Sequence, residues 1–185
     1  MTCGRPPALV LFDRDGTLVE DVPYNGDPGL VVPVTGARSA LALLRRYGVR
    51  TGVVTNQSGV GRGLLTMDQV RRVNERVERL LGPFDVWAVC PHAPEDGCGC
   101  RKPAPGLVLA AGRLLGVDPA RCAVVGDIGS DMAAAAAAGA AGVLVPTPVT
   151  RPEEVACAPR TARDLPGAVR TLLGLGVAVP DGGAR

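Results

Sequence analysis

The chain has 185 residues and a formal net charge of +2, with 20 Lys and Arg against 18 Asp and Glu. This length suits one domain with a proper hydrophobic core, and the near-neutral charge argues against a nucleic-acid backbone or an anionic membrane as partner. No apolar run approaches the length of a membrane-spanning helix and the N-terminus lacks a signal-peptide pattern, so we expect a cytoplasmic protein.

Short apolar runs alternate with helical patterns along the chain, which predicts a parallel sheet with helices on its faces. Strands are expected at residues 8–12, 49–55, 84–90, 122–125 and 142–145. Helices are expected at residues 36–47, 66–81, 105–115, 131–138 and 165–173. A capping box of Thr66 and Gln69 opens the second helix, and Ser130 and Gly139 are the expected ends of the alanine-rich fourth.

The chain is predicted to fold as one unit of the α/β class, a Rossmann-like three-layer sandwich around a central parallel sheet. Residues 1–176 form this domain, and residues 177–185 are expected to be a flexible tail. The polar segment 19–35 follows the first strand and is too short to be a large cap domain. We therefore expect a small, open site in a monomeric protein.

The first expected strand ends abruptly in two carboxylates, Asp13 and Asp15, followed by Gly16. The carboxyl end of a parallel strand is where open α/β sheets bind ligands. Of two such carboxylates, one can attack phosphorus or bind a metal while the other passes a proton to the leaving oxygen. Asp is also common where an ordinary strand enters a turn, so this motif alone leaves both interpretations open.

Three more polar clusters follow the next strands: residues 55–63, the pair Arg101 and Lys102, and the pair Asp127 and Asp131. The glycine-rich first cluster lets backbone N–H groups face an anion. Lys102 is the chain's single lysine, and a compact ammonium suits a single phosphate oxygen. Carboxylates after the first and fourth strands could share Mg²⁺. Each cluster alone could be surface charge, but together they predict one site.

A second cluster of ligands lies between the third strand and Lys102. Cys90, His92, Cys98 and Cys100 offer three thiolates and an imidazole, a set suited to a closed tetrahedral Zn²⁺ site. The alternatives are a disulfide, which the cytoplasm disfavours, and unrelated buried thiols. A closed site leaves no position for substrate, so the zinc-binding loop is expected to be structural.

These motifs in chain order resemble the four motifs of the haloacid dehalogenase (HAD) superfamily of phosphatases, over residues 8–146. The motif residues are Asp13-x-Asp15-Gly-Thr, Thr55, Lys102 and Gly-Asp127-x-x-x-Asp131. The resemblance implies that Asp13 is the nucleophile forming an aspartyl-phosphate and that Asp15 is the acid for the leaving group and then the base for water. It further implies that Thr55 and Lys102 stabilise the transferring phosphoryl group.

The same resemblance implies a catalytic Mg²⁺. Its ligands would be the Asp13 carboxylate, the backbone carbonyl of Asp15 and the Asp127 carboxylate, with Asp131 supporting the site near Lys102. Because an Asp nucleophile and a phosphate repel each other, the chemistry itself also calls for a cation.

Residues 13–18, 55–59, 90–92 and 98–103 are more narrowly similar to the heptose bisphosphate phosphatases and their histidinol-phosphatase relatives. This similarity implies Mg²⁺-dependent removal of the C7 phosphate of D-glycero-D-manno-heptose 1,7-bisphosphate. It implies substrate contacts from Glu20, Asp21, Tyr24, Asn56, Gln57, Ser58 and Arg101. Arg101 could grip a second phosphate, with a solvated loop charge as the alternative. Ile128 stands where some relatives have a polar substrate contact, which leaves the sugar and its anomer open.

The sequence leaves other functions open. A histidinol-phosphate phosphatase, or a phosphatase of another small sugar phosphate, would use the same chemistry. A zinc-stabilised phosphate-binding module without turnover is a different class, disfavoured because Asp13 and Asp15 are both present. A nucleic-acid end phosphatase is disfavoured by the near-neutral charge and the 3% content of aromatic residues.

Overall fold

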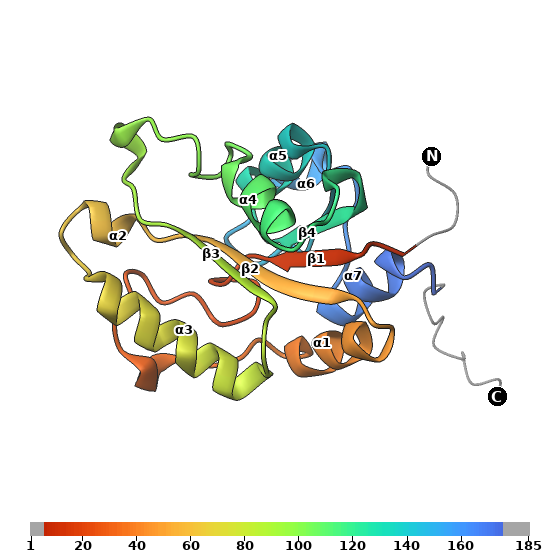
Figure 1. Ribbon diagram of the computed structural model, residues 1–185, viewed down its shortest axis with the longest axis horizontal. Coiled ribbons are helices and arrows are strands. Elements are labelled where there is room, and N and C mark those ends of the chain that lie inside the picture. Colours follow the sequence, from red (N-terminus) through yellow and green to blue (C-terminus); the bar gives the residue numbers. More distant parts are fainter. Residues whose placement is uncertain (1–5, 176–185) are drawn as a thin grey trace.

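The computed structural model describes residues 6–175, which are built around a five-stranded, all-parallel sheet (Figure 1). The predicted tail at residues 177–185 lies outside the described residues. Along the sheet the strands are ordered β3-β2-β1-β4-β5. Their bounds are β1 Leu9–Phe12, β2 Arg50–Asn56, β3 Val86–Cys90, β4 Cys122–Gly126 and β5 Ala141–Leu144.

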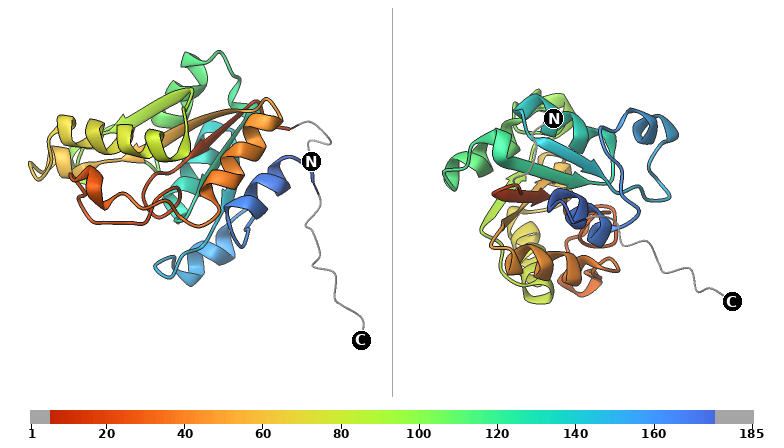
Figure 2. Two further views of the ribbon diagram at one scale, coloured as in Figure 1. Left: turned by 90° about the horizontal axis from the view of Figure 1, so that it is seen from below. Right: turned by 90° about the vertical axis from the view of Figure 1, so that its right-hand side faces the viewer.

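Helices cover both faces of the sheet, which makes the three-layer sandwich that the sequence predicts (Figures 1 and 2). Helices α1, α3 and α7 pack on one face, α4 and α5 pack on the other, and α6 lies against α5. Their bounds are α1 Ala37–Arg46, α2 Ser58–Gly61, α3 Met67–Leu81, α4 Gly106–Leu114, α5 Gly129–Ala138, α6 Pro152–Cys157 and α7 Leu165–Leu172. Three 3₁₀ turns are η1 Pro28–Leu30, η2 Pro94–Asp96 and η3 Pro119–Arg121.

The central strand β1 shows why this sequence forms a sheet buried on both sides. All four of its side chains are 0% exposed. Val10 and Phe12 pack among α1, α3 and α7, whereas Leu9 and Leu11 pack among α4 and α5. A strand covered on both faces needs this unbroken apolar run rather than an alternating one.

The strand order also decides where a ligand can bind. The chain passes from β1 through β2 to β3 on one side, then returns to place β4 and β5 on the other side of β1. The crevice at such a reversal, beyond the carboxyl ends of the strands, is the usual ligand site of open α/β sheets. Asp13 directly follows β1 and Asp127 directly follows β4, so both carboxylates lie at this crevice.

The expected strands and long helices are confirmed with shifts of one or two residues at their ends. The Thr66 to Gln69 capping box is present, and Gly139 ends α5 with a left-handed φ of 76°. The prediction that Ser130 caps α5 is wrong, because Ile128 occupies the N-cap position and the helix begins at Gly129, two residues before the predicted start. The short helices α2 and α6 were not expected. Among residues 6–175, no helix is both long and apolar enough to span a membrane.

Candidate active site

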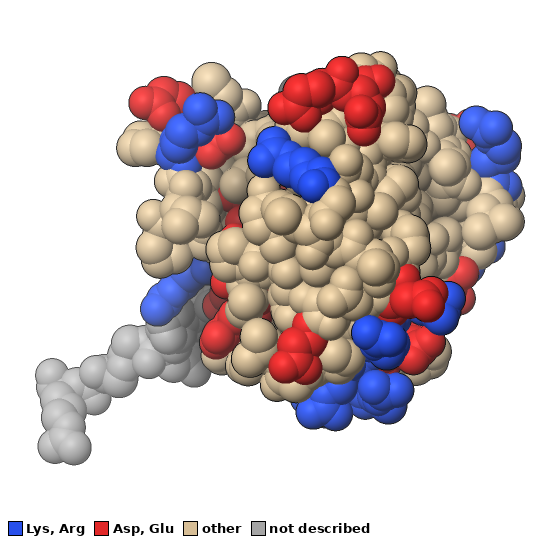
Figure 3. All heavy atoms as spheres, turned by 90° about the vertical axis from the view of Figure 1, so that its left-hand side faces the viewer, with Lys and Arg blue, Asp and Glu red and all other residues tan. Residues whose placement is uncertain are grey.

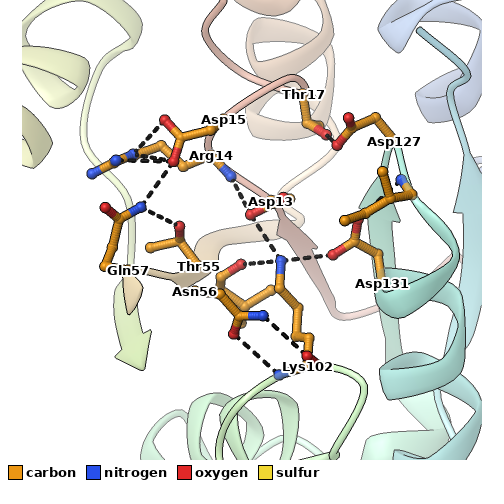
Figure 4. A network of polar contacts seen from close by, with 12 residues as sticks. Asp13, Arg14, Asp15, Thr17, Thr55, Asn56, Gln57, Lys102, Asp127 and Asp131 are labelled. Atoms are coloured by element: carbon orange, nitrogen blue, oxygen red, sulfur yellow. Dashed lines mark hydrogen bonds and ion pairs between the residues drawn. The ribbon is translucent and has the colours of Figure 1, made fainter. Parts of the chain in front are cut away.

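The centre of the site is an ammonium held between two buried carboxylates (Figure 4). Lys102 Nζ lies 2.8 Å from Asp13 Oδ1 and 2.6 Å from Asp131 Oδ1, and it donates to the Val54 carbonyl at 3.0 Å. Lys102 is 3% exposed and Asp131 is 0% exposed. Burial alone lowers the pKa of Lys102, but the Asp13 and Asp131 carboxylates together raise it above its usual value, so the side chain is a cation.

A third carboxylate, Asp127, faces this group from the end of β4. Its Oδ1 accepts a hydrogen bond from Thr17 Oγ1 at 3.0 Å, and burial raises its pKa to about 6. Gly16 has a φ of +77° and lies so close that an added Cβ would collide with the Asp127 carboxylate. The glycine after the two motif carboxylates is therefore required both for the turn and for the approach of Asp127.

The three carboxylates form a fitting site for a hard divalent cation. One oxygen from each of Asp13, Asp127 and Asp131 lies within 4.8 Å of the others, and all three residues are buried. When all three carboxylates are ionised, the single ammonium of Lys102 leaves two negative charges in excess. Burial raises the pKa of Asp13 to about 8 in spite of Lys102, so further positive charge beside Asp13 would favour its ionised form. Mg²⁺ prefers such oxygen ligands and would supply that charge.

Asp15 points away from this cation site. Its carboxylate accepts hydrogen bonds from Arg14 Nε at 3.0 and 3.2 Å, from Arg14 Nη2 at 2.9 Å and from Gln57 Nε2 at 2.8 Å. Gln57 Nε2 also donates to Thr55 Oγ1 at 3.0 Å. Thr55, at the end of β2, is thus joined to Asp15 through one amide, while Asp13 is joined to Lys102.

Asn56 fixes the loop that carries Lys102. The Asn56 amide donates from Nδ2 to the Lys102 carbonyl and accepts from the Lys102 N–H at Oδ1, both at 3.1 Å. The side chain of the last residue in β2 therefore pairs with a backbone 46 positions further along the chain. These two hydrogen bonds give Asn56 a structural role in placing the Lys102 backbone.

A pocket of about 560 Å³ opens over these groups. Its lining includes all four residues with predicted catalytic roles, and also most of the predicted substrate contacts, namely Asp21, Tyr24, Asn56, Gln57, Ser58 and Arg101. Figure 3 looks onto this end of the molecule, where acidic and basic side chains lie in small groups, some mixed and some of one sign, with wide uncharged surface between them. The view shows no continuous basic surface of the kind that would track a nucleic-acid backbone.

The structure does not bring Glu20 to the pocket. The prediction that Glu20 contacts the substrate is not supported, because Glu20 is exposed and absent from the lining. Its N–H bonds to the Val32 carbonyl at 2.9 Å, and its neighbour Val19 bridges Pro33 and is 3% exposed. In such an extended segment adjacent side chains point to opposite sides, so burying Val19 turns Glu20 outward.

A residue outside the predicted set, Arg62, contacts the pocket-lining Tyr24. Arg62 Nη1 donates to the Tyr24 hydroxyl at 3.1 Å, and Arg62 Nη2 lies 3.8 Å from the Glu95 carboxylate. Tyr24 has a left-handed φ of 51°. Arg62 therefore links the segment after β1 to the loop after β3.

Sequence reasoning also missed Arg14, Thr17 and Asn74. Arg14 is 1% exposed and contacts Asp15 and Asn74, and Thr17 bonds to Asp127. The sequence position of Arg14 could have indicated its role. Arg14 stands between two motif carboxylates at the end of a buried strand, and a charge buried there requires a partner.

The four predicted zinc ligands come together in the loop that leaves β3. One ligand atom from each of Cys90, His92, Cys98 and Cys100 lies within 4.8 Å of the others. The separations are 3.1 to 3.6 Å between sulfur atoms and 3.2 and 3.6 Å from His92 Nδ1 to Cys100 and Cys90. With zinc–ligand bonds of about 2.0–2.3 Å, a tetrahedral ion requires donors at about this spacing. The donor set therefore fits Zn²⁺.

Comparisons with known proteins agree with the geometry. The profile of the HAD-hydrolase-like family matches residues 99–170. A D-glycero-beta-D-manno-heptose-1,7-bisphosphate 7-phosphatase of Bordetella bronchiseptica is 37% identical over 144 residues. The match covers 75% of this chain and 80% of the Bordetella chain. The enzyme of the same name from Salmonella typhi is 37% identical over 180 residues, and the match covers 89% of this chain and 95% of the Salmonella chain.

Among solved structures, the D,D-heptose 1,7-bisphosphate phosphatase of Bordetella bronchiseptica, complexed with magnesium and phosphate, superimposes with a TM-score of 0.81 at 32% identity. The match covers 91% of this chain and 99% of that one.

Proposed function

Because the chain belongs to the HAD-like hydrolases, and within them to the heptose-1,7-bisphosphate 7-phosphatase family, we propose that it removes the C7 phosphate of D-glycero-D-manno-heptose 1,7-bisphosphate with Mg²⁺ as cofactor. The observation that carries this proposal is the buried group of Asp13, Lys102 and Asp127 at the mouth of the sheet crevice. Phosphoryl transfer depends on positioning and charge stabilisation, and this group offers both.

The proposed reaction has two steps. In the first, Asp13 attacks phosphorus, the ester P–O bond breaks, and the electron pair passes to the leaving oxygen, which takes a proton from Asp15. Asp13 Oδ1 already accepts from Lys102 and from the Arg14 N–H at 2.7 Å, so we assign the attack to Oδ2. In the second step, Asp15 takes a proton from water as that water attacks the aspartyl-phosphate, which returns Asp13 to a free carboxylate.

Lys102 and Thr55 are proposed to stabilise the transferring phosphoryl group, since both line the pocket beside Asp13. Mg²⁺ would be held by Asp13, by the backbone carbonyl of Asp15 and by Asp127, and would supply positive charge next to the phosphoryl oxygens. Asp131 would act through Lys102, which it contacts, and not on the substrate.

We also propose that Cys90, His92, Cys98 and Cys100 hold a structural Zn²⁺. Cys100 lies two residues before Lys102, so a metal that ties the loop together would hold Arg101 and Lys102 at the pocket. A monomeric state and a cytoplasmic location stay predictions from the sequence.

Histidinol phosphate is the competing substrate, and the charges of the pocket lining bear on the choice. An amine substrate would favour an acidic group at the rim, but of the three candidates Glu20, Asp21 and Glu95 only Asp21 lines the pocket. Arg101 lines it too and could grip a second phosphate. This balance favours a bisphosphate.

The test is phosphate release in the presence of Mg²⁺ from both heptose bisphosphate anomers, histidinol phosphate and simple sugar phosphates, compared by kcat/KM. A preference of about tenfold for one heptose anomer, about 1.4 kcal/mol of transition-state binding, would support the proposal. Preference for histidinol phosphate would replace the substrate and keep the mechanism. Release from none of them would favour a phosphate-binding module.

A further inference from the structure

Among residues 6–175, Arg14 is the largest residue that is less than 2% exposed, and the reaction described above gives its guanidinium no role. It follows Asp13 and precedes Asp15 at the end of β1. A charged group is rarely buried so fully unless every part of it is paired, because leaving water is costly for an ion. The hydrogen bonds of the Arg14 guanidinium therefore indicate its role.

One edge of the guanidinium grips Asp15. Nε and Nη2 donate to the two carboxylate oxygens at 3.0 and 2.9 Å, the planar two-point geometry that arginine forms with carboxylates and lysine does not. Gln57 Nε2 adds a third donor at 2.8 Å. Figure 4 shows the Asp15 carboxylate turned toward these two side chains, while Asp13 faces Lys102.

The other edge of the guanidinium is anchored to a different layer of the fold. Arg14 Nη1 donates to Asn74 Oδ1 at 2.7 Å, across 60 positions of sequence. Asn74 lies in the middle of α3, directly after Val73, which is buried in the core, and α3 is capped at its start by the Thr66 to Gln69 box. The guanidinium plane is thus fixed between the end of β1 and a helix that packs on the sheet.

We propose that Arg14, held by Asn74, is a positioning residue that orients the Asp15 carboxyl group for proton transfer to the leaving oxygen. The inference rests on the proposed function, because it assigns Arg14 to the proton that Asp15 supplies when the ester P–O bond breaks. Small errors in the placement of a catalytic group reduce rates strongly, which gives a reason to hold Asp15 from two layers of the fold.

The inference predicts an effect that depends on the leaving group. A sugar alkoxide leaves only with a proton, whereas p-nitrophenolate leaves readily without one. Asn74→Ala should lower kcat/KM for the preferred sugar phosphate by about 10- to 100-fold. This loss is smaller than the whole rate contribution of a general acid, because Asp15 itself is still present. It should lower kcat/KM for p-nitrophenyl phosphate by less than about threefold. Arg14→Lys keeps the charge, loses the two-point geometry and should show the same selectivity.

Two further variants make the test specific. In an Asp15→Asn background, Asn74→Ala should change the sugar-phosphate kcat/KM by less than about twofold, because its effect passes through Asp15. Glu75→Ala is the matched control, since Glu75 follows Asn74 on α3, is exposed and lies 3.9 Å from Arg71. It should leave both substrates and the thermal unfolding midpoint unchanged.

Equal losses on both substrates in Asn74→Ala, or losses that multiply with those of Asp15→Asn, would overturn the inference, since a general structural role acts on both leaving groups. A parent enzyme that releases phosphate from no ester would overturn the proposed function and the inference with it. Selective loss in Asn74→Ala, absent in the Asp15→Asn background, would support the inference.

Discussion

Replacing Lys102 with methionine should test whether its ammonium is the countercharge of the site. Methionine has a similar length but no charge, so the variant leaves the Asp131 carboxylate, which is 0% exposed, without its ion-pair partner at 2.6 Å. Breaking a buried pair by removing one partner costs about 3–5 kcal/mol. In a domain of this size each kcal/mol shifts the unfolding midpoint by about 2–4 °C, so we expect a loss of about 6–20 °C.

The assay is thermal and urea unfolding without added Mg²⁺, with Arg71→Met as the matched control. Arg71 also lies near two carboxylates, Asp68 at 3.1 Å and Glu75 at 3.9 Å, but its side chain is 66% exposed where that of Lys102 is 2% exposed. Exposed ion pairs contribute little, so the control should unfold within about 0.5 kcal/mol of the parent.

The same variant should lose at least about 100-fold in kcat, because an oriented charge at the developing phosphoryl oxygens is removed. If Lys102→Met unfolds within about 1 kcal/mol of the parent, the buried carboxylates do not depend on this ammonium, and our account of the charge balance is refuted.

Three other predictions concern single positions. Asp13→Asn should fold with stability equal to or above the parent, since it removes a buried carboxylate, yet lose roughly 10⁴-fold or more in kcat; turnover near that of the parent would remove Asp13 from the nucleophile role. Cys98→Ser should lower the zinc content measured by mass spectrometry from one ion per chain and reduce stability, whereas Cys157→Ser, outside the ligand cluster, should change neither. Gly16→Ala should raise the Mg²⁺ concentration needed for half-maximal activity, whereas Gly63→Ala, with a φ of +70° but open space around it, should show only the backbone cost of about 1 kcal/mol or more in unfolding. Equal Mg²⁺ requirements in the two glycine variants would contradict the predicted clash.

The residues at the strand ends could be predicted from the sequence because the parallel sheet itself brings them together. Asp13, Thr55 and Asp127 each stand at or directly after the end of a strand, and parallel strands end at one edge of the sheet. Lys102 follows β3 at a greater distance, and its lone occurrence in the chain drew attention to it.

The contact between Arg14 and Asn74 could not be predicted in the same way. Arg14 and Asn74 are 60 positions apart and meet only because α3 packs on the face of the sheet, which no local pattern encodes. Helix α6 is a different case, since Pro152 at its first position and two glutamates in its first turn are sequence signals of a helix start. Helix α2, with four residues in a glycine-rich loop, has no such signal.

The amide of Asn56 has a mechanical consequence for the lysine. The Asn56 side chain donates to the Lys102 carbonyl and accepts from the Lys102 N–H. These two hydrogen bonds replace the pair that a neighbouring strand would form with the backbone, at the residue where β2 ends. The loop around Lys102 is thereby hydrogen-bonded to the end of β2 without being a strand itself. Lys102, which we propose contacts the phosphoryl group, therefore keeps a fixed position relative to the sheet although it lies in a loop.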